Sequence, residues 1–409
     1  MDIYIKKRIA ALSAALLLAL SCAGCGNGNS SSDKGSSEAE ASAASDSSDG
    51  AGTEESSADT TGDSKEVDMQ IRDISSKELL KEIKIGWNLG NTMDATGDPT
   101  LGAETHWQTT TTSVYMFELL KDTGFDIVRI PVSWGEHMDS SYKVDPEWMA
   151  RVHEIVDYGI SNGLYVILNT HHENWYMPTE EDKPQDLEQL KALWQQIAEE
   201  FKGYDEHLIF EGVNEPRLRD TPLEWTGGTA VSRKIVAEYV KTFYETVRAS
   251  GGNNAKRHLM LTGYAAASRK DCLQDVWLPE NDDKVIVSVH AYLPYNFALN
   301  VKGTDKWSID KDTGEIDTFF KVLDELFVSK DIPVMIGEFG VLNKDNLEDR
   351  IACTEYYISK ARELGIPCLW WDNNSVFGNG ENFGIMDRSM IPVWRYQRLT
   401  DAIIKAAKG

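Results

Sequence analysis

Two glutamates, Glu215 and Glu338, each follow an apolar segment and could act as a catalytic pair. They occur in the segments Asn214-Glu215-Pro216 and Ile336-Gly337-Glu338-Phe339-Gly340. Two carboxyl groups that flank a glycosidic bond, one protonated and one ionised, can cleave that bond. Mutual repulsion and partial burial would raise the pKa of one carboxyl group, while a cation such as Arg129 would keep the other ionised. We therefore expect Arg129 to contact Glu338.

Further polar and aromatic residues stand at the ends of other apolar segments. They are Asn88 and Asn91, Arg129, His171 and His172, Asn214, His290 and Tyr292, and Trp371, Asp372 and Asn373. A single glutamate at such a position more often forms a structural ion pair. A fold that brought these segment ends together would instead surround the two glutamates with hydrogen-bonding groups, and the Tyr292 hydroxyl could then donate to Glu338.

The elements that must position these residues alternate between two kinds. Eight short, nearly continuous apolar runs are typical of strands buried on both faces: 83–89, 125–132, 164–171, 208–214, 258–264, 285–292, 332–339 and 366–371. Between them lie helical patterns, among them 145–161, 186–204, 232–249, 318–328 and 347–364. Asp145-Pro146 is a helix start signal. The alternation predicts a single (β/α)₈ barrel over residues 67–409, with its active site at the carboxyl ends of the strands.

The first 66 residues have a different composition. Residues 1–25 combine a basic start, an apolar run from Ile9 to Leu20 and small residues, as in a secretory signal peptide. Residues 26–66 are rich in Ser, Asp and Glu and contain no aromatic residue, so we expect a disordered acidic linker. Cys25 follows Ala23-Gly24 and is the expected lipidation site of a membrane-anchored lipoprotein. Ordinary cleavage and free secretion is the alternative.

The charge of the chain restricts its partners. The formal net charge is −25, of which residues 1–66 carry −6 and residues 67–409 carry −19. Such an acidic surface repels nucleic acid and anionic membranes, so we expect neither as a partner. All twelve Trp lie after residue 86, which favours a neutral substrate that stacks on flat rings. The cysteines of this region, Cys272, Cys353 and Cys368, are expected to be buried core residues.

Two other features have competing interpretations. His171 and His172 could bind a metal, but the sequence shows no nearby Cys or Asp to complete a ligand set, so we expect no metal and no cofactor. Trp134 is expected to pack in the core. Aromatic residues in the segments after the first, third, fourth and sixth strands could line a cleft, and we expect about half of them to do so; they are Trp107, Trp175, Trp225 and Tyr295.

Six segments together resemble glycoside hydrolase family 5, the cellulase family of the retaining, two-glutamate barrel enzymes. They occur in family order: 86–91 (GWNLGN), 128–132 (VRIPV), 214–216 (NEP), 290–292 (HAY), 336–340 (IGEFG) and 371–373 (WDN). The match extends from about residue 80 to 400 and most resembles the endoglucanase and xyloglucanase branch. Asn374 departs from the pattern because it stands where glycine is usual.

The resemblance implies a role for each matching residue. Glu215 corresponds to the acid/base and Glu338 to the nucleophile. Asn214 corresponds to the residue that binds the sugar 2-hydroxyl, and Arg129 and Tyr292 to the hydrogen-bonding partners of the nucleophile. Further matching or nearby residues would line the cleavage site or bind substrate: His171, His290, Trp371, His172, Asn88, Trp175 and Tyr295.

These inferences together predict a secreted or cell-surface retaining endo-β-1,4-glucanase that acts on plant cell-wall β-1,4-linked polysaccharide. Xyloglucanase, lichenase and mannanase activities of the same family are alternatives. A barrel that binds carbohydrate without catalysis is the alternative from another class, as is a metal-dependent hydrolase. We expect a monomer.

Overall fold

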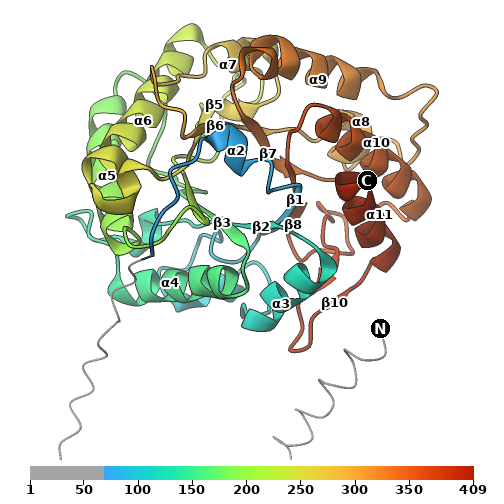
Figure 1. Ribbon diagram of the computed structural model, residues 1–409, viewed down its shortest axis with the longest axis horizontal. Helices are drawn as coiled ribbons and strands as arrows, with labels where there is room; N and C mark the ends of the chain where they lie inside the picture. Colours follow the sequence, from blue (N-terminus) through green and yellow to red (C-terminus); the bar gives the residue numbers. More distant parts are fainter. Residues whose placement is uncertain (1–68) are drawn as a thin grey trace, which may run out of the picture. The chain divides into compact units, whose positions relative to one another are not determined.

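The computed structural model describes residues 69–409, so the predicted signal peptide and linker lie outside the described residues. Eight parallel strands form a closed barrel in which each strand pairs with the next and β8 pairs with β1 (Figure 1). The strands are β1 (Ile85–Leu89), β2 (Ile127–Ile130), β3 (Tyr165–Asn169), β4 (Leu208–Glu211), β5 (Leu259–Ala267), β6 (Val285–His290), β7 (Val334–Phe339) and β8 (Cys368–Asp372). The predicted (β/α)₈ barrel is therefore confirmed.

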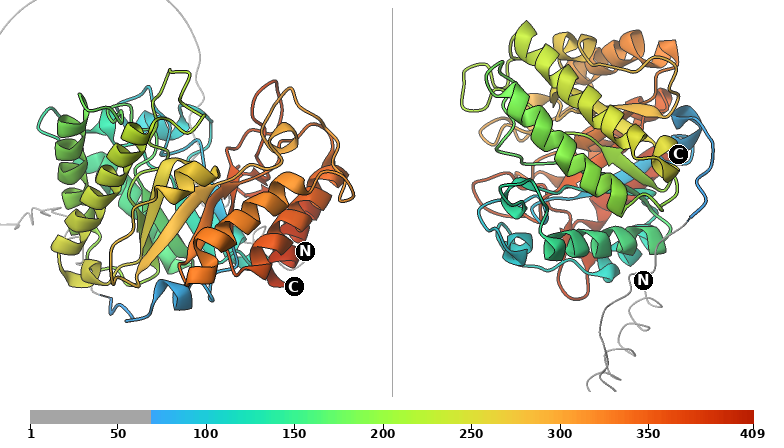
Figure 2. Two further views of the ribbon diagram at one scale, coloured as in Figure 1. Left: turned by 90° about the horizontal axis from the view of Figure 1, so that it is seen from above. Right: turned by 90° about the vertical axis from the view of Figure 1, so that its left-hand side faces the viewer.

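Helices surround the barrel on the outside (Figures 1 and 2). The longer ones are α3 (Val114–Thr123), α4 (Pro146–Ser161), α5 (Lys183–Glu200), α6 (Ala230–Ala249), α9 (Gly314–Leu326), α10 (Leu347–Glu363) and α11 (Gln397–Lys408). The five helical patterns read from the sequence correspond to α4, α5, α6, α9 and α10. The start of α4 is as predicted, because the Asp145 side chain accepts hydrogen bonds from the backbone N–H groups of Glu147 and Trp148.

The amino-terminal end of the barrel interior is filled by apolar side chains. Inward-facing residues of seven strands cluster there with Leu79 and Leu80, at the end of the short helix α2 (Ser76–Leu79). The strand residues are Ile127, Ile167, Ile209, Met260, Ile286, Met335 and Leu369. On β1 the corresponding position is Gly86, where a Cβ atom would lie 2.5 Å from side-chain atoms of both Ile127 and Leu369. Glycine is required at this position because the two neighbours already fill the space.

The next inward-facing position on each strand lies two residues further on, since side chains alternate between the two faces. These positions are mostly polar: Asn88, Arg129, Asn169, Glu211, Thr262, Ser288, Gly337 and Trp371. The barrel interior thus changes from an apolar layer to a polar layer toward the carboxyl ends of the strands. This polar layer is the base of the site described below.

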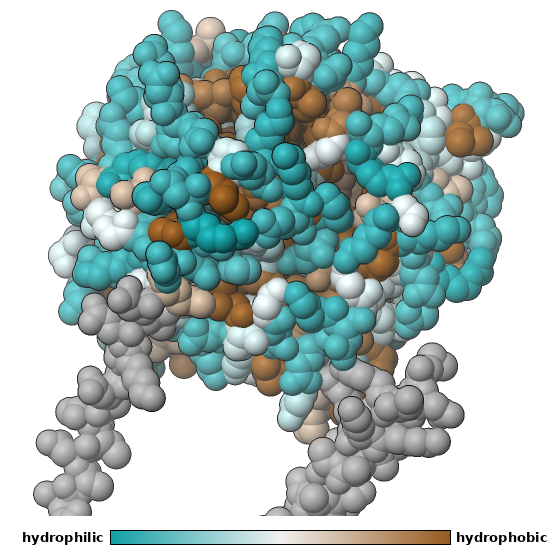
Figure 3. Space-filling view, in the orientation of Figure 1, coloured by the Kyte–Doolittle hydropathy of each residue, from teal (hydrophilic) through white to brown (hydrophobic). Residues whose placement is uncertain are grey.

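The surface of the described region is seen from one side in Figure 3. One face of the protein is covered mostly by hydrophilic residues with scattered apolar ones (Figure 3). Within residues 69–409, none of the helices combines the length and the apolar character that crossing a membrane requires. Cys272, Cys353 and Cys368 are buried free thiols, as expected.

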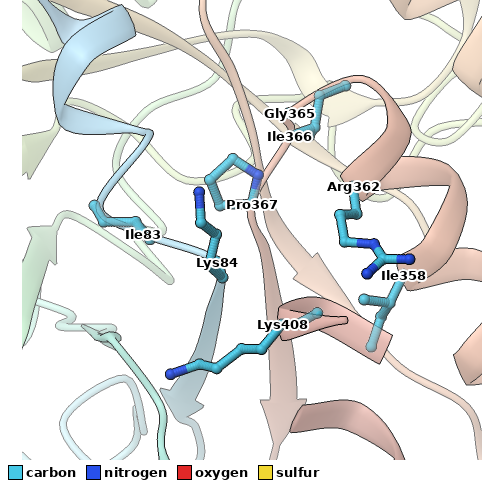
Figure 4. A pocket seen from close by; sticks show the side chains of 9 residues that line it. Ile83, Lys84, Ile358, Arg362, Gly365, Ile366, Pro367 and Lys408 are labelled. Atoms are coloured by element: carbon cyan, nitrogen blue, oxygen red, sulfur yellow. The ribbon is translucent and has the colours of Figure 1, made fainter. Parts of the chain in front are cut away.

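A cavity of about 380 Å³ lies at the amino-terminal ends of β1 and β8 (Figure 4). Its wall combines the cations Lys84, Arg362 and Lys408 with apolar side chains, among them Ile366. Because Lys84 and Ile366 precede β1 and β8, the cavity is at the opposite end of the barrel from Glu215 and Glu338. It is therefore not the site predicted from the sequence.

Candidate active site

Arg129 is the centre of the polar layer, and it is completely buried. Its Nη1 atom donates to Glu338 Oε1 at 2.8 Å, so the predicted contact is present. Its Nε atom donates to Glu211 Oε2 at 2.7 Å, and its Nη2 atom donates to Asn214 Oδ1 at 2.6 Å. Burial opposes the positive charge, but the carboxylates of Glu211 and Glu338 outweigh it and raise the pKa of Arg129. The guanidinium is thus a fixed positive charge beneath Glu338.

Glu338 reaches the interior because β7 is irregular just before it. In regular alternation after Met335, Gly337 would face inward and Glu338 outward. The pairing register shifts here, so that Val289 pairs with Ile336 but His290 pairs with Glu338. A bulge of this kind turns the side chain toward the opposite face of the strand. The Gly337 carbonyl accepts a hydrogen bond from Asn88 Nδ2 at 2.9 Å, which holds this irregular segment in place.

Tyr292 completes the hydrogen bonding of Glu338. Its hydroxyl donates to Oε2 at 2.8 Å, as predicted from the sequence. Burial, together with the negative charge of Glu338, holds the pKa of Tyr292 well above its ordinary value. Tyr292 therefore keeps its proton at neutral pH and acts as a donor there. Arg129 and Tyr292 thus each donate to a different oxygen of Glu338.

Glu215 has a different environment. His290 Nδ1 lies 2.8 Å from its Oε1 atom, and Arg217 Nη1 lies 3.7 Å from its Oε2 atom. One oxygen of Glu215 and one oxygen of Glu338 lie within 4.8 Å of each other. The two predicted glutamates therefore converge, with cationic and phenolic donors on Glu338 and an imidazole on Glu215.

The distribution of pKa shifts differs from the prediction. We expected repulsion and burial to raise the pKa of one glutamate. Burial does act in that direction on Glu215, but the hydrogen bond and charge of His290 outweigh it and lower the pKa of Glu215. The pKa of His290 is raised instead, because the charges of Glu338 and Glu215 overcome its burial. His290 therefore favours the ionised form of Glu215, and the two carboxyl groups favour the protonated form of His290.

His171 and Trp371 lie against each other in the same site. Their rings are parallel within 4°, with centroids 5.7 Å apart. Asn169 Nδ2 lies 3.1 Å from His171 Nδ1. Burial lowers the pKa of His171 well below its ordinary value, so His171 is neutral. Trp371 approaches β1 closely, since a Cβ atom at Gly90 would lie 2.8 Å from its indole.

An aspartate does lie beside the two histidines, contrary to our expectation. One ligand atom from each of Asp94, His171 and His172 falls within 4.8 Å of the others. The carboxylate of Asp94 is buried and already accepts the backbone N–H groups of Asn91 at 3.0 Å and Thr92 at 2.7 Å. These bonds assign Asp94 to the turn after β1.

Asn88 is not placed to bind substrate, and this prediction is wrong. Its side chain is completely buried in the polar layer. Its Oδ1 atom accepts from Arg129 Nη1 at 3.0 Å, while its Nδ2 atom donates to the Gly337 carbonyl. Through these two hydrogen bonds, Asn88 orients Arg129 and the irregular segment before Glu338.

Glu211 is the main residue that the sequence interpretation missed. It is completely buried and accepts from Arg129, from Asn169 Nδ2 at 2.9 Å and from Ser288 Oγ at 2.6 Å. The available signal was a charged residue within the apolar run Leu208–Val213. A buried carboxylate requires a cationic partner, which here is Arg129.

The aromatic residues of the loops differ in exposure. Trp134 is completely buried, as predicted, and donates to the Asn169 carbonyl at 2.9 Å. Trp225 and Tyr295 are exposed by 58% and 52%. Trp107 is 42% exposed and its ring lies 5.4 Å from that of His172, while Trp175 is partly buried.

The structure explains the departure at Asn374. The residue has a φ of +58°, in the left-handed region where glycine is favoured and asparagine is tolerated. Its backbone N–H donates to Asp372 Oδ1 at 2.9 Å, and its Nδ2 atom donates to Gln108 Oε1 at 3.1 Å. Asn374 therefore occupies a backbone conformation in which glycine is the favoured residue.

Comparison with known proteins identifies relatives of this site and fold. The family model "Cellulase (glycosyl hydrolase family 5)" matches residues 93–376. Endoglucanase B of Ruminococcus albus is 55% identical over 338 residues, which are 82% of this chain and 81% of that protein.

Two solved structures are also similar. One is a GH5-4 broad specificity endoglucanase from Ruminococcus champanellensis with bound cellotriose, with a TM-score of 0.80 and 45% identity; the match covers 82% of this chain and 100% of that one. The other is a GH5-4 broad specificity endoglucanase from Clostridium longisporum, with a TM-score of 0.79 and 43% identity over 83% and 99% of the two chains.

Proposed function

Because this chain belongs to the cellulase family, glycosyl hydrolase family 5, we propose that Glu215 and Glu338 are the catalytic pair of an enzyme that cleaves β-1,4-linked glucan. The enzyme is an endo-β-1,4-glucanase. The observation that carries the residue assignment is the approach of the two carboxyl groups to within 4.8 Å. Retaining glycosidases have a separation of about 5–5.5 Å, whereas inverting enzymes need about 6.5–9.5 Å to admit a water molecule.

In the first step, Glu338 is the nucleophile. Its carboxylate attacks the anomeric carbon, and the bond from that carbon to the glycosidic oxygen breaks. The proton shared by Glu215 and His290 passes through Glu215 to the departing oxygen, and the pair stays one proton short until the second step restores it. The hydrogen bonds from Arg129 and Tyr292 orient the carboxyl group of Glu338 before the attack.

In the second step, Glu215 is the base. It removes a proton from water, whose oxygen bonds to the anomeric carbon while the bond to Glu338 breaks. The sugar leaves with its original configuration, and both glutamates return to their starting states. Asn214 supports both steps: its Oδ1 atom accepts from Arg129, so the group it offers to a sugar hydroxyl is its NH₂ donor.

Substrate breadth is the finer part of the proposal. We propose activity on cellulose-like, mixed-linkage and xyloglucan chains, because the two structural neighbours described above are broad specificity endoglucanases. A net charge of −25 favours neutral chains over acidic ones. Mannan requires a different hydroxyl configuration at the cleavage site and is the alternative substrate.

A cell-surface location is also proposed, from the sequence alone. Residues 1–25 have the pattern of an export signal, and Cys25 is placed for lipidation. The acidic, Ser-rich residues 26–66 would then separate the barrel from the membrane. An enzyme held in this way would reach polymer outside the cell.

Release of reducing ends from carboxymethyl-cellulose, lichenan, xyloglucan and mannan tests the function. We expect hydrolysis of the first three, with a rapid fall in viscosity because cleavage occurs within chains. Exhaustive chelation should leave the activity unchanged. Absence of activity on all four polymers would favour the carbohydrate-binding alternative. The Glu338→Gln variant controls for contaminating glucanases.

A further inference from the structure

Glu173 is a buried carboxylate that the mechanism above does not use. It lies in the loop after β3 and is 2% exposed. Its Oε1 atom accepts the backbone N–H of Trp134 at 2.7 Å, and its Oε2 atom accepts that of Gly135 at 2.9 Å. Oε2 also accepts the indole N–H of Trp175 at 2.6 Å. Glu173 therefore connects the loop after β2 to the ring of Trp175.

The ring of Trp175 is held by its surroundings as well as by this bond. Tyr176 packs against it edge to face, with ring centroids 5.0 Å apart. A Cβ atom at Gly135 would lie 2.7 Å from Trp175 Cδ1 and 2.9 Å from Glu173 Oε2. Gly135 therefore lets the ring and the carboxylate approach the backbone closely. The indole has one orientation rather than several.

The loop after β4 links this assembly to the segment that carries Glu215. Arg219 Nη1 donates to the Glu173 carbonyl at 2.8 Å, and its Nη2 atom donates to the Asn174 carbonyl. Arg217, two residues earlier, donates to the Glu215 carbonyl at 3.0 Å. Trp175 is thus connected, through Arg219 and the loop after β4, to the segment that carries Glu215, the proposed proton donor to the departing part of the substrate.

We propose that Glu173 is a positioning residue that holds Trp175 as a stacking surface for a glucosyl unit on the leaving-group side of a neutral β-glucan chain. This inference rests on the proposed function of Glu215. Aromatic rings that bind sugars must be fixed in orientation before binding, since ordering a side chain on binding costs affinity. Burial raises the pKa of Glu173 to about 7, so its carboxylate is increasingly ionised above neutral pH.

Two substrates separate this role from a structural one, assayed at pH 7.5. Cellohexaose occupies the leaving-group side, whereas the leaving group of β-cellobiosyl fluoride is a single atom. Glu173→Gln should raise KM for cellohexaose about three- to tenfold, the contribution of one stacking contact. Its kinetics on the fluoride should stay within twofold of the unsubstituted enzyme.

Gly135→Ala provides a second variant that keeps the glutamate at position 173. Its Cβ atom would displace the Trp175 ring or the Glu173 carboxylate, so it should reproduce the KM increase. Glu206→Gln is the matched control, because Glu206 is also a buried glutamate that accepts a backbone N–H, from Arg72 at 2.8 Å. Glu206 precedes β4, at the far end of the barrel. Its substitution should not change the kinetics on one substrate more than on the other.

A double variant decides whether Glu173 acts through Trp175. Trp175→Ala should raise KM for cellohexaose, and adding Glu173→Gln should raise it no further. Full additivity, or equal losses on both substrates, would overturn the inference while leaving the function of Glu215 and Glu338 intact. Inactivity of the unsubstituted enzyme on both substrates would overturn the proposed function as well.

Discussion

His290 Nδ1 lies 2.8 Å from Oε1 of Glu215 and 3.6 Å from Oε2 of Glu338, so one imidazole contacts both catalytic carboxyl groups. Burial disfavours a charge on His290, but the two carboxylates raise its pKa above the ordinary 6.5. The same contact lowers the pKa of Glu215. In the proposed mechanism, the proton donor to the leaving group is therefore a histidine–glutamate pair rather than an isolated glutamic acid.

The pH dependence of hydrolysis follows from this pair. Its proton is bound below the raised pKa of His290 and is lost as the pH rises through it. We expect kcat/KM on cellohexaose to decline with a midpoint above pH 6.5, and His290→Asn to shift that midpoint. The leaving group of β-cellobiosyl fluoride needs no proton donor. The rate of the first step with this substrate should therefore not decline as the pH rises. If the His290→Asn variant showed the same decline of kcat/KM at alkaline pH, the assignment of this decline to His290 would be wrong.

Substitutions of the two glutamates should have different effects on the kinetics. Glu338→Gln removes the nucleophile and should lower kcat on every substrate by at least about 10⁴-fold, as loss of a covalent catalyst does. Glu215→Gln should impair cellohexaose by about 10²- to 10⁴-fold, the usual contribution of a general acid. The same substitution should leave the rate of glycosyl-enzyme formation from β-cellobiosyl fluoride nearly unchanged. Equal losses on both substrates for Glu215→Gln, measured by stopped-flow release of fluoride, would exclude it as the acid.

Substitution of Asn88 tests whether the buried polar layer contributes to catalysis. Asn88→Ala removes one acceptor of Arg129 and the donor to the Gly337 carbonyl. Each lost buried hydrogen bond costs about 1–3 kcal/mol. We expect kcat to fall about tenfold or more while KM changes less than twofold, because Asn88 does not reach the substrate. A raised KM with unchanged kcat would restore the substrate-binding role first predicted for it.

The raised pKa of Glu173 predicts that the stability of the protein depends on pH. Its pKa is about 7 in the folded protein and about 4.5 when exposed, so the folded state binds its proton more tightly. The free energy of unfolding should therefore decrease as the pH rises from 4.5 to 7, by about 3 kcal/mol from this group. Urea unfolding of Glu173→Gln beside the unsubstituted protein should show a flatter profile over this range. Parallel profiles would mean that Glu173 is not protonated in the folded state.

The location of the protein depends on Cys25. If it is lipidated, the native enzyme should partition with membranes, and Cys25→Ser should release it in active form. Cys22→Ser is the matched control and should stay with the membrane. Recovery of the unsubstituted enzyme wholly from the medium, without an acyl group, would exclude the anchor and leave the catalytic proposal unaffected.

The barrel and its main site residues could be predicted because their signals are local. Apolar runs bounded by helix caps such as Asp145 define the strands and helices, and residues at strand ends must converge in a closed parallel barrel. Other features depend on tertiary context. The bulge at Gly337 turns Glu338 inward against the regular alternation, and the glycine itself is the one hint of it in this segment. The burial of Asn88, the pairing of Glu211 with Arg129 and the pKa of His290 arise only when several strands close around them.

The stereochemistry of the first product tests the central proposal most directly. If Glu338 forms a covalent intermediate and Glu215 activates the water that resolves it, the anomeric carbon is inverted twice. Proton NMR of cellohexaose hydrolysis should then show the β-anomer of the new reducing end in the first minutes, before mutarotation produces the α-anomer. An early excess of the α-anomer would mean a single displacement by water and would contradict the two-glutamate retaining mechanism.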